Sequence, residues 1–134
     1  MSQIPSKDES DEQTQDQGNA GTSWQHRAEM ALSAALQAGQ TITYAELADA
    51  ATIPKPQRIH KLTVWLESTM RKDHADGKPL RAALVISRNR SGLPAPGFFM
   101  LCGELGLYDG SGSGESAVHF HRTSINDLWR KLDP

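Results

Sequence analysis

The sequence predicts a small α+β domain of the winged helix-turn-helix class, preceded by a disordered acidic tail. Three observations lead to this prediction. Residues 40–59, QTITYAELADAATIPKPQRI, have the pattern of a capped short helix, a proline-marked turn and the start of a longer helix. An aliphatic run at residues 80–87 and a turn rich in glycine and proline follow, as a wing requires. The first 22 residues contain almost no apolar side chains.

The chain of 134 residues is expected to divide at residue 22. Residues 1–22 hold five acids and one base, and they bury too little apolar surface to offset the entropy of ordering them. Residues 23–134 are long enough for one core, so we expect one winged-helix-like domain there. No signal-peptide pattern and no apolar run of roughly 20 residues is present, which predicts a cytoplasmic protein without membrane contact. The single cysteine, Cys102, fits a reducing compartment.

Two helices are expected to open the domain. Apolar residues recur at helical spacing over residues 24–38, and Gly39 supplies the stop. After a short extended piece, Thr43 and Glu46 have the spacing of a capping box, in which each side chain bonds the backbone amide of the other residue. A second helix is therefore expected over residues 44–51.

The third helix is expected to be the long one. Pro54 and Pro56 bar continuation of the second helix, yet they suit the first turn of another, because proline lacks only a donor that would be unpaired there. The apolar residues that follow fall at intervals of three and four, which predicts one buried stripe. That stripe is Ile59, Leu62, Leu66 and Met70.

The second half of the domain is expected to supply the sheet. Residues 80–87, LRAALVIS, suit a buried strand, and the run NRSGLPAPG after it suits a turn or wing. Residues 98–105 repeat helically, and the stretch DGSGSGES is typical of a flexible linker or hairpin tip. Residues 118–122, VHFHR, alternate like a return strand, and a last helix begins with Ser124 as its cap.

Charge is uneven along the chain. Nine bases face three acids within residues 55–90, while the tail has the opposite balance. A basic segment beside an acidic tail fits a polyanion-binding surface with a competing intramolecular mimic. A solvated helix face explains most charge runs equally well, so charge alone leaves both interpretations open.

The segment TITYAELADAATIPKPQRIHKL resembles the DNA-binding domain of methylguanine-DNA methyltransferases and the alkyltransferase-like proteins. The family pattern is a V-x-T/S-Y-x-x-L-A helix followed by G-x-P-x-A-A-R-A. Tyr44 falls on the family tyrosine that contacts phosphate beside the target nucleotide, and Arg58 falls on the arginine that replaces a flipped base. Ser91 and Gly92 match the S-G-x-x-G turn. The resemblance covers roughly half of the chain, residues 40–97, and implies a DNA-binding winged helix.

The same motifs exclude the alkyl-transfer reaction of that family. Where the family has P-C-H-R, this chain reads A-L-V-I at residues 83–86, so the nucleophilic cysteine and its activating histidine are missing. Cys102 does not replace them, because a cysteine inside an apolar helical stripe is more commonly a buried, inert thiol. Pro56 and Gln57 stand in place of the two family alanines. Without a Walker loop, dinucleotide fingerprint or Ser-His-Asp motif, we expect neither an enzyme nor a cofactor.

The sequence therefore predicts a non-catalytic protein that binds duplex DNA, as a regulator or an accessory factor. Phosphate contacts from bases of the third helix and the wing would supply most of the affinity, with Arg58 probing the groove or base stack. The predicted DNA-binding residues are Tyr44, Lys55, Gln57, Arg58, Lys61, Arg88 and Arg90. Each has a structural alternative: Tyr44 could pack in the core, and Arg58 and Lys61 could merely solubilise the outer face of the helix.

A second hypothesis makes the domain a scaffold for a protein partner. Trp65, Phe98 and Phe99 would then form an exposed apolar docking patch, and the acidic tail would bind a basic partner. For Trp65 a packing role is favoured over base stacking, because no second aromatic follows at a suitable spacing. His119 and His121 are expected to be surface imidazoles and not metal ligands, since no acid or cysteine pair accompanies them.

Overall fold

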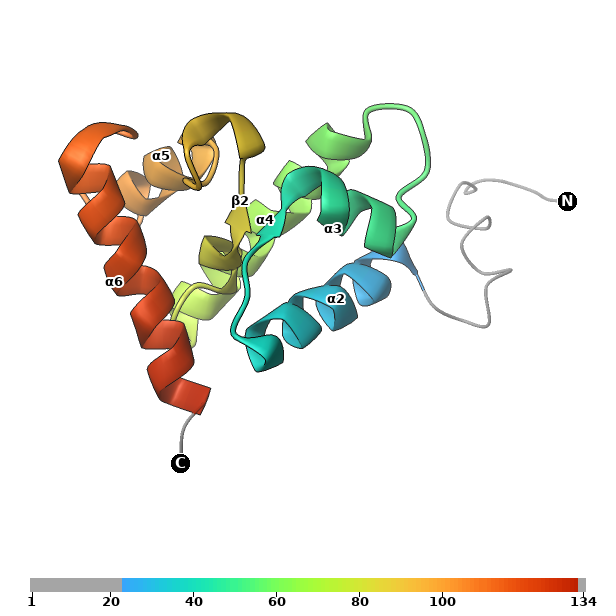
Figure 1. The fold of residues 1–134 in the computed structure, drawn as a ribbon, viewed down its shortest axis with the longest axis horizontal. Coiled ribbons are helices and arrows are strands. Elements are labelled where there is room, and N and C mark those ends of the chain that lie inside the picture. Colours follow the sequence, from blue (N-terminus) through green and yellow to red (C-terminus); the bar gives the residue numbers. More distant parts are fainter. Residues whose placement is uncertain (1–22, 133–134) are drawn as a thin grey trace, which may run out of the picture.

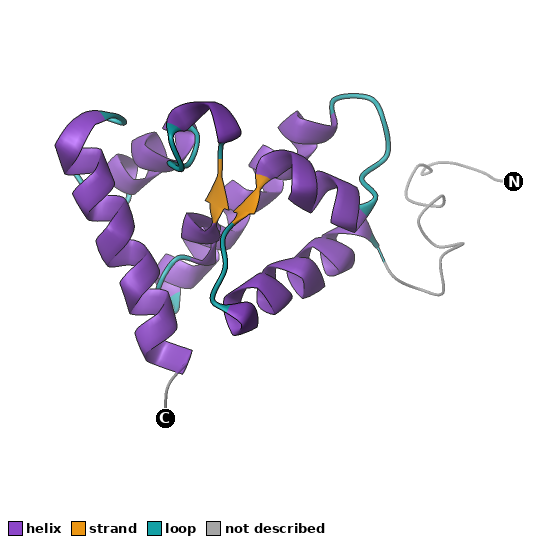
Figure 2. Ribbon diagram, viewed as in Figure 1, coloured by secondary structure: helices purple, strands orange, loops and turns teal. Residues whose placement is uncertain are grey.

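The computed structural model describes residues 23–132, and the predicted acidic tail, residues 1–22, lies outside that range. Helices dominate the described part, and a two-stranded parallel sheet lies among them (Figures 1 and 2). None of these helices is long and apolar enough to span a membrane. At this coarse level the α+β class holds, although the helical content is larger than the sequence pattern predicts.

The elements follow one another in two groups. The first group is α2 (Trp24–Ala38), β1 (Ile42–Thr43), α3 (Tyr44–Ala51) and α4 (Arg58–Ala75). The second group is the 3₁₀ helix η1 (Arg81–Leu84), β2 (Val85–Ile86), the 3₁₀ helix η2 (Arg88–Arg90), α5 (Pro96–Glu104) and α6 (Gly114–Leu132).

The first two predicted helices are confirmed with their boundaries. Ser23 caps α2 by accepting the amide of His26 at 3.1 Å, and Gly39 ends it with a φ of 68°. The predicted capping box opens α3: Thr43 Oγ1 accepts the amide of Glu46 at 3.1 Å, and Glu46 Oε1 accepts the amide of Thr43 at 2.9 Å. The bond from the Thr43 amide to this carboxylate, followed by the effect of the Thr43 side chain, is the main reason that the pKa of Glu46 is lowered.

The third predicted helix exists as α4, but two details differ. Pro54 and Pro56 lie in the connecting turn and not in the first helical turn, because α4 begins only at Arg58, after Gln57 with a φ of 59°. In the predicted stripe, Leu62, Leu66 and Met70 are buried. Ile59 is 46% exposed, since the first turn of α4 reaches past the residues that cover the rest of the stripe.

The sheet is smaller than the predicted one and differs in direction. β1 and β2 pair in parallel, with Ile42 opposite Val85 and Thr43 opposite Ile86. The predicted strand at residues 80–87 shrinks to two residues, because its first half forms η1, whose alanines and leucine are buried in the core. Parallel strands need a long crossover, which α3 and α4 supply here.

The predicted return strand at residues 118–122 is wrong. These residues belong to α6, which begins ten residues before the predicted cap, Ser124. The buried side chains of α6 recur at helical spacing, and they are Ala117, His121, Ile125 and Leu128. No wing hairpin therefore forms within residues 23–132, and η2 occupies the place where the wing is expected.

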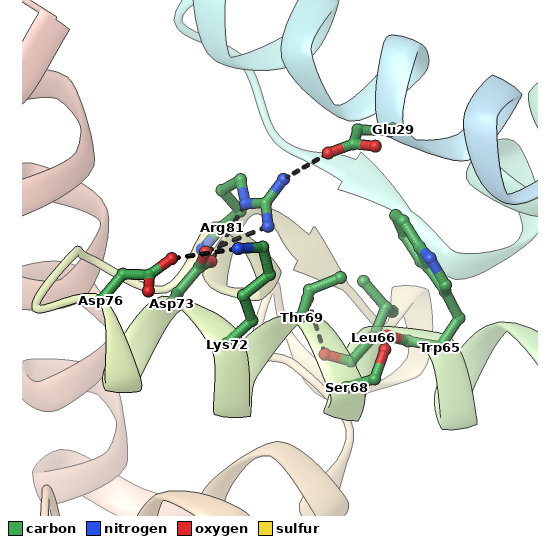
Figure 3. Close-up of polar contacts among 9 residues, drawn as sticks. All are labelled: Glu29, Trp65, Leu66, Ser68, Thr69, Lys72, Asp73, Asp76 and Arg81. Carbon is green, nitrogen blue, oxygen red and sulfur yellow. Dashed lines mark hydrogen bonds and ion pairs between the residues drawn. The ribbon is translucent and has the colours of Figure 1, made fainter.

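A buried ion pair joins three elements of the core (Figure 3). Asp73 of α4 is 3% exposed, and it accepts Arg81 Nε and Nη2, each at 3.0 Å, as well as the Arg81 amide at 3.1 Å. The same guanidinium reaches α2 through Glu29 Oε2 at 3.1 Å. The bonds to Asp73 are the main reason that the pKa of Arg81 is raised. Arg81, one base of the predicted polyanion surface, is thus a structural tie.

The predicted helix at residues 98–105 is confirmed as α5, and its apolar side chains are core residues. Phe98 and Phe99 are only 5% and 3% exposed and contact Phe120 of α6, so the predicted docking patch on these two residues is wrong. Cys102 is fully buried, and burial raises the pKa of its thiol to about 12. The prediction that Cys102 is buried inside the apolar stripe is confirmed.

Candidate nucleic-acid interface

The α3-turn-α4 unit lies at one end of the molecule, with α2 packed behind it (Figure 1). Thr52 ends α3 with a φ of 54°, and the buried side chain of Ile53 anchors the turn to the core. The turn and the first turn of α4 are exposed, with the exception of the buried Ile53 and the half-buried Arg58 and Lys61. The predicted order of a short capped helix, a turn and a longer helix is therefore present.

Arg58, predicted to probe DNA, is held by the protein itself. Its Nε donates to the Ile53 carbonyl at 2.7 Å, and its Nη2 donates to the Ala48 carbonyl at 2.9 Å. Nη1 completes the set with Asp49 Oδ1 at 3.1 Å. The Ala48 carbonyl lies at the C-terminal end of α3, where it also accepts the amides of Thr52 and Ile53, and the Ile53 carbonyl lies in the turn. Arg58 therefore fixes α4 against α3.

Lys61 has a similar role one turn further along α4. Its Nζ donates to the Pro54 carbonyl at 2.9 Å, so a second cation binds the backbone of the same turn. The contacts of Arg58 and Lys61 give both residues a structural role that neither of the two sequence interpretations includes. A DNA contact by either residue stays a prediction.

Tyr44 and Arg90 bond the backbone of the segments that flank α5. Tyr44 Oη accepts the amide of Ala95 at 3.0 Å, and burial is the main cause that raises the pKa of this phenol. Arg90 Nε donates to the Pro94 carbonyl at 2.9 Å, and its Nη2 bonds the Gly112 carbonyl. These bonds join η2 to the segments before and after α5. The glycine-rich stretch predicted to be a flexible linker is held by one of them.

Three of the predicted residues remain available to a ligand. Lys55 and Gln57 are exposed in the turn, and Arg88 is exposed on η2. Within residues 23–132, neither Lys55 nor Arg88 makes a hydrogen bond or an ion pair. Arg88 lies close enough to Glu46 to contribute, after the larger effects of Thr43, to the lowered pKa of that carboxylate.

Two hollows flank the first turn of α4, and Ile59 forms the ridge between them. The first has a volume of about 980 Å³ and is bordered by Lys55, Gln57 and His60. The second has a volume of about 440 Å³ and is bordered by Thr63, Arg88 and Asn89. We call the residues on and beside this ridge the ridge surface; they are Lys55, Gln57, Ile59, His60, Thr63, Arg88 and Asn89.

Four residues of the ridge surface are not among the DNA-binding residues that the sequence predicts. Ile59 was assigned to the core by its spacing, and His60, Thr63 and Asn89 were not among the predicted binding residues. Their position in the sequence is the feature that could have identified them. They follow a proline-marked turn or lie in the expected wing, and winged helix-turn-helix proteins contact DNA through these segments. One acid, Asp49, lines the larger hollow, and it pairs with Arg58.

The other bases of the charged segment lie away from the ridge surface. Arg71 reaches Glu104 at 3.9 Å, and Lys72 pairs with Asp76 at 3.1 Å. Together with Arg81 they occupy the C-terminal half of α4 and the segment after it, and α4 is about 27 Å long at 1.5 Å per residue. The basic residues of segment 55–90 therefore lie in two groups, one near each end of α4.

The remaining predictions concern aromatic and imidazole side chains. Trp65 packs edge-on against Trp24 with ring centroids 6.3 Å apart, which confirms the packing role. His119 is exposed as predicted, but His121 is 7% exposed and its Nε2 lies 2.8 Å from the Ala83 carbonyl. In the described part of the chain no three His, Cys, Asp or Glu side chains are placed to share a metal ion.

No protein-family model, no curated protein and no solved structure matches this chain. Any function must therefore be argued from the ridge surface and its chemistry.

Proposed function

We propose that this protein binds duplex DNA without catalysis, through the ridge surface of its helix-turn-helix. The carrying observation is the exposed first turn of α4, where Ile59 stands between two hollows with a free lysine on one side and a free arginine on the other. Ile59 is one of several exposed apolar side chains in the described residues, and it is the one in the N-terminal turn of α4, the part of a recognition helix that faces a groove.

The chemistry of the ridge surface divides into two kinds of contact. Lys55 and Arg88 would bind phosphates on either side of the groove, which fixes register and supplies affinity. Gln57 and His60 carry donors and acceptors suited to base edges, and Ile59 offers an apolar contact. The positive end of the α4 macrodipole adds to the attraction for phosphate.

The resemblance to alkyltransferase-like proteins supports the same function but assigns Arg58 a different place. To enter a duplex, Arg58 would have to leave the carbonyls of Ala48 and Ile53 and the carboxylate of Asp49. We therefore assign the first contact with DNA to the residues that are already free, and to Arg58 the task of holding the angle between α3 and α4. The buried Cys102 supports binding without alkyl transfer.

Fluorescence anisotropy with a labelled duplex tests the proposal. The double variant Lys55→Gln/Arg88→Gln should lose about tenfold or more in affinity at low salt, and the slope of log K against log[salt] should fall by about 2, because two phosphate contacts are removed. The matched control is Lys78→Gln/Lys131→Gln, which removes the same charge from exposed lysines at the far end of α4 and on α6. Absence of binding at low salt, or equal losses in both variants, would overturn the proposal.

A further inference from the structure

The first described residues lie beside the helix-turn-helix turn. Ser23 begins α2, and four residues later Arg27 Nε donates to the carbonyl of Ala51, the last residue of α3, at 2.7 Å. Figure 1 shows the start of α2 directly next to the loop that leaves α3. The described domain therefore begins next to the C-terminal end of α3.

The larger hollow near this junction has a positive character. Lys55 borders it without an ion-pair partner in the described range, and Arg58 and Lys61 lie next to it. The one carboxylate that lines it, Asp49, is already paired with Arg58. An anionic segment would meet an uncompensated lysine there and would not face a free carboxylate.

The first 22 residues have the chemistry of such a segment. They contain five acids and a single base, and the acids are Asp8, Glu9, Asp11, Glu12 and Asp16. Seven residues of chain from Asp16 to Ser23 span at most about 25 Å, and the stretch from Asp8 spans about twice as much. These spans are the upper limits on the reach of the acids from Ser23.

We propose that residues 8–16 of the same chain dock at the hollow bordered by Lys55 and compete there with DNA. The competition rests on the proposed DNA-binding function, but the docking does not. A tethered segment has an effective concentration of about a millimolar, so even a weak contact is populated. The interaction is electrostatic and is screened when the Debye length falls to about 3 Å in 1 M salt.

Paramagnetic relaxation measured on the full chain tests the docking directly. A nitroxide is attached at Ser10→Cys, and the chain without this substitution is treated in the same way to measure any labelling of the buried Cys102. The amide signals of Asp49, Lys55 and His60 should be broadened, and those of Lys78 should not. A mixture of spin-labelled and isotope-labelled chains should show no broadening, because the contact is intramolecular.

Two variants connect this signal to charge. Replacement of the five tail acids by Asn or Gln in the spin-labelled chain should abolish the broadening. Lys55→Gln should reduce it severalfold, whereas Lys78→Gln, the matched control, should leave it unchanged. Absence of broadening in the wild-type sequence, or broadening that survives charge neutralisation, overturns the docking.

DNA binding then tests the competition. The chain with neutralised tail acids should bind duplex DNA about two- to tenfold more tightly than the wild type at low salt. Since neutralisation also raises the net charge, the comparison is repeated with Lys55→Gln, in which the gain should shrink. Broadening without DNA binding by any chain would support the docking and overturn the DNA-binding function. Equal DNA affinities of the wild type and the neutralised chain, together with no broadening, would overturn only the docking inference.

Discussion

The two ends of α4 carry cations of the same kind and use them differently. At the C-terminal end, Lys72 pairs with Asp76, and Arg81 packs against the buried Asp73. At the N-terminal end, Arg58 bonds two backbone carbonyls and the carboxylate of Asp49, and Lys61 bonds the Pro54 carbonyl alone. A carboxylate cancels the charge of its partner, whereas a carbonyl leaves that charge in place. Lys61, together with Lys55 in the turn, therefore keeps this end positive.

The cations at the C-terminal end of α4 therefore stabilise the fold, whereas the N-terminal end also forms an exposed surface. The buried ion pair fixes α2, α4 and η1 to one another (Figure 3), and carboxylates compensate the charge of its guanidinium. The N-terminal end keeps its shape through Arg58 and presents Ile59 and His60 to solvent. A count of basic residues along the chain cannot distinguish these two uses.

The largest effect is expected at the buried ion pair. Asp73→Ala would leave the guanidinium and the amide of Arg81 without their main acceptor, which should lower the free energy of unfolding by about 3 kcal/mol. Urea denaturation measures the loss. The control is Asp76→Ala, which removes an exposed i,i+4 pair and should change the free energy by less than about 1 kcal/mol. Equal losses in Asp73→Ala and Asp76→Ala would show that the buried ion pair stabilises the fold no more than the exposed pair does.

The next effect contrasts two residues of one apolar stripe. Leu62→Ala should destabilise the fold by about 2 to 4 kcal/mol, because Leu62 is fully buried. Ile59→Ala, one turn earlier, should change the free energy of unfolding by less than about 1 kcal/mol, because almost half of that side chain is exposed. Thermal unfolding of both variants makes the comparison. A large loss of stability in Ile59→Ala would show that Ile59 belongs to the core.

A third comparison concerns the two cations at the turn. Arg58→Ala should lower the free energy of unfolding by about 1 to 3 kcal/mol, since the Ile53 carbonyl and Asp49 lose the guanidinium donor and the Ala48 carbonyl keeps only backbone donors. Lys55→Ala should leave stability within about 0.5 kcal/mol and weaken DNA binding instead. Denaturation and anisotropy on the same preparations give both values. The opposite pattern would make Arg58 the ligand-binding residue.

The smallest effect is a dependence on pH. Burial lowers the pKa of His121 below its ordinary value of 6.5, and the bond to the Ala83 carbonyl opposes this only in part. The unfolded chain then binds the proton more readily, so this contribution to stability is present above about pH 6.5 and is lost as the pH falls through the folded pKa. His121→Gln should flatten the fall, and the exposed His60→Gln should not. An unchanged profile in His121→Gln would contradict this assignment.

The sequence predicted the elements that have local stop and start signals. The limits of α2 and α3 follow from Gly39 and from the capping box of Thr43 and Glu46, and each signal acts within a few residues. The return strand failed because five alternating residues also fit one face of a helix, and the length of α6 depends on packing against η1. Two-residue strands leave no periodicity to detect.

The candidate site was only partly predictable for a different reason. Lys55, Gln57 and Arg88 could be selected because a charged or polar side chain beside a turn is usually exposed. The role of Arg58 could not, since its acceptors include the carbonyls of Ala48 and Ile53, and backbone groups have no sequence signature. The exposure of Ile59 depends on where α4 extends past its neighbours, which is a tertiary property.

The most direct measurement is a titration of the isotope-labelled full chain with a short duplex, followed by amide chemical shifts. The ridge surface predicts that the largest changes cluster at Lys55, Ile59, His60 and Arg88 and diminish as salt is raised. The amides of Asp73 and Arg81, at the other end of α4, should remain unchanged. Absence of shifts at low salt, or shifts centred on Lys78 and Lys131, would contradict the claim that the N-terminal end of α4 is the binding surface.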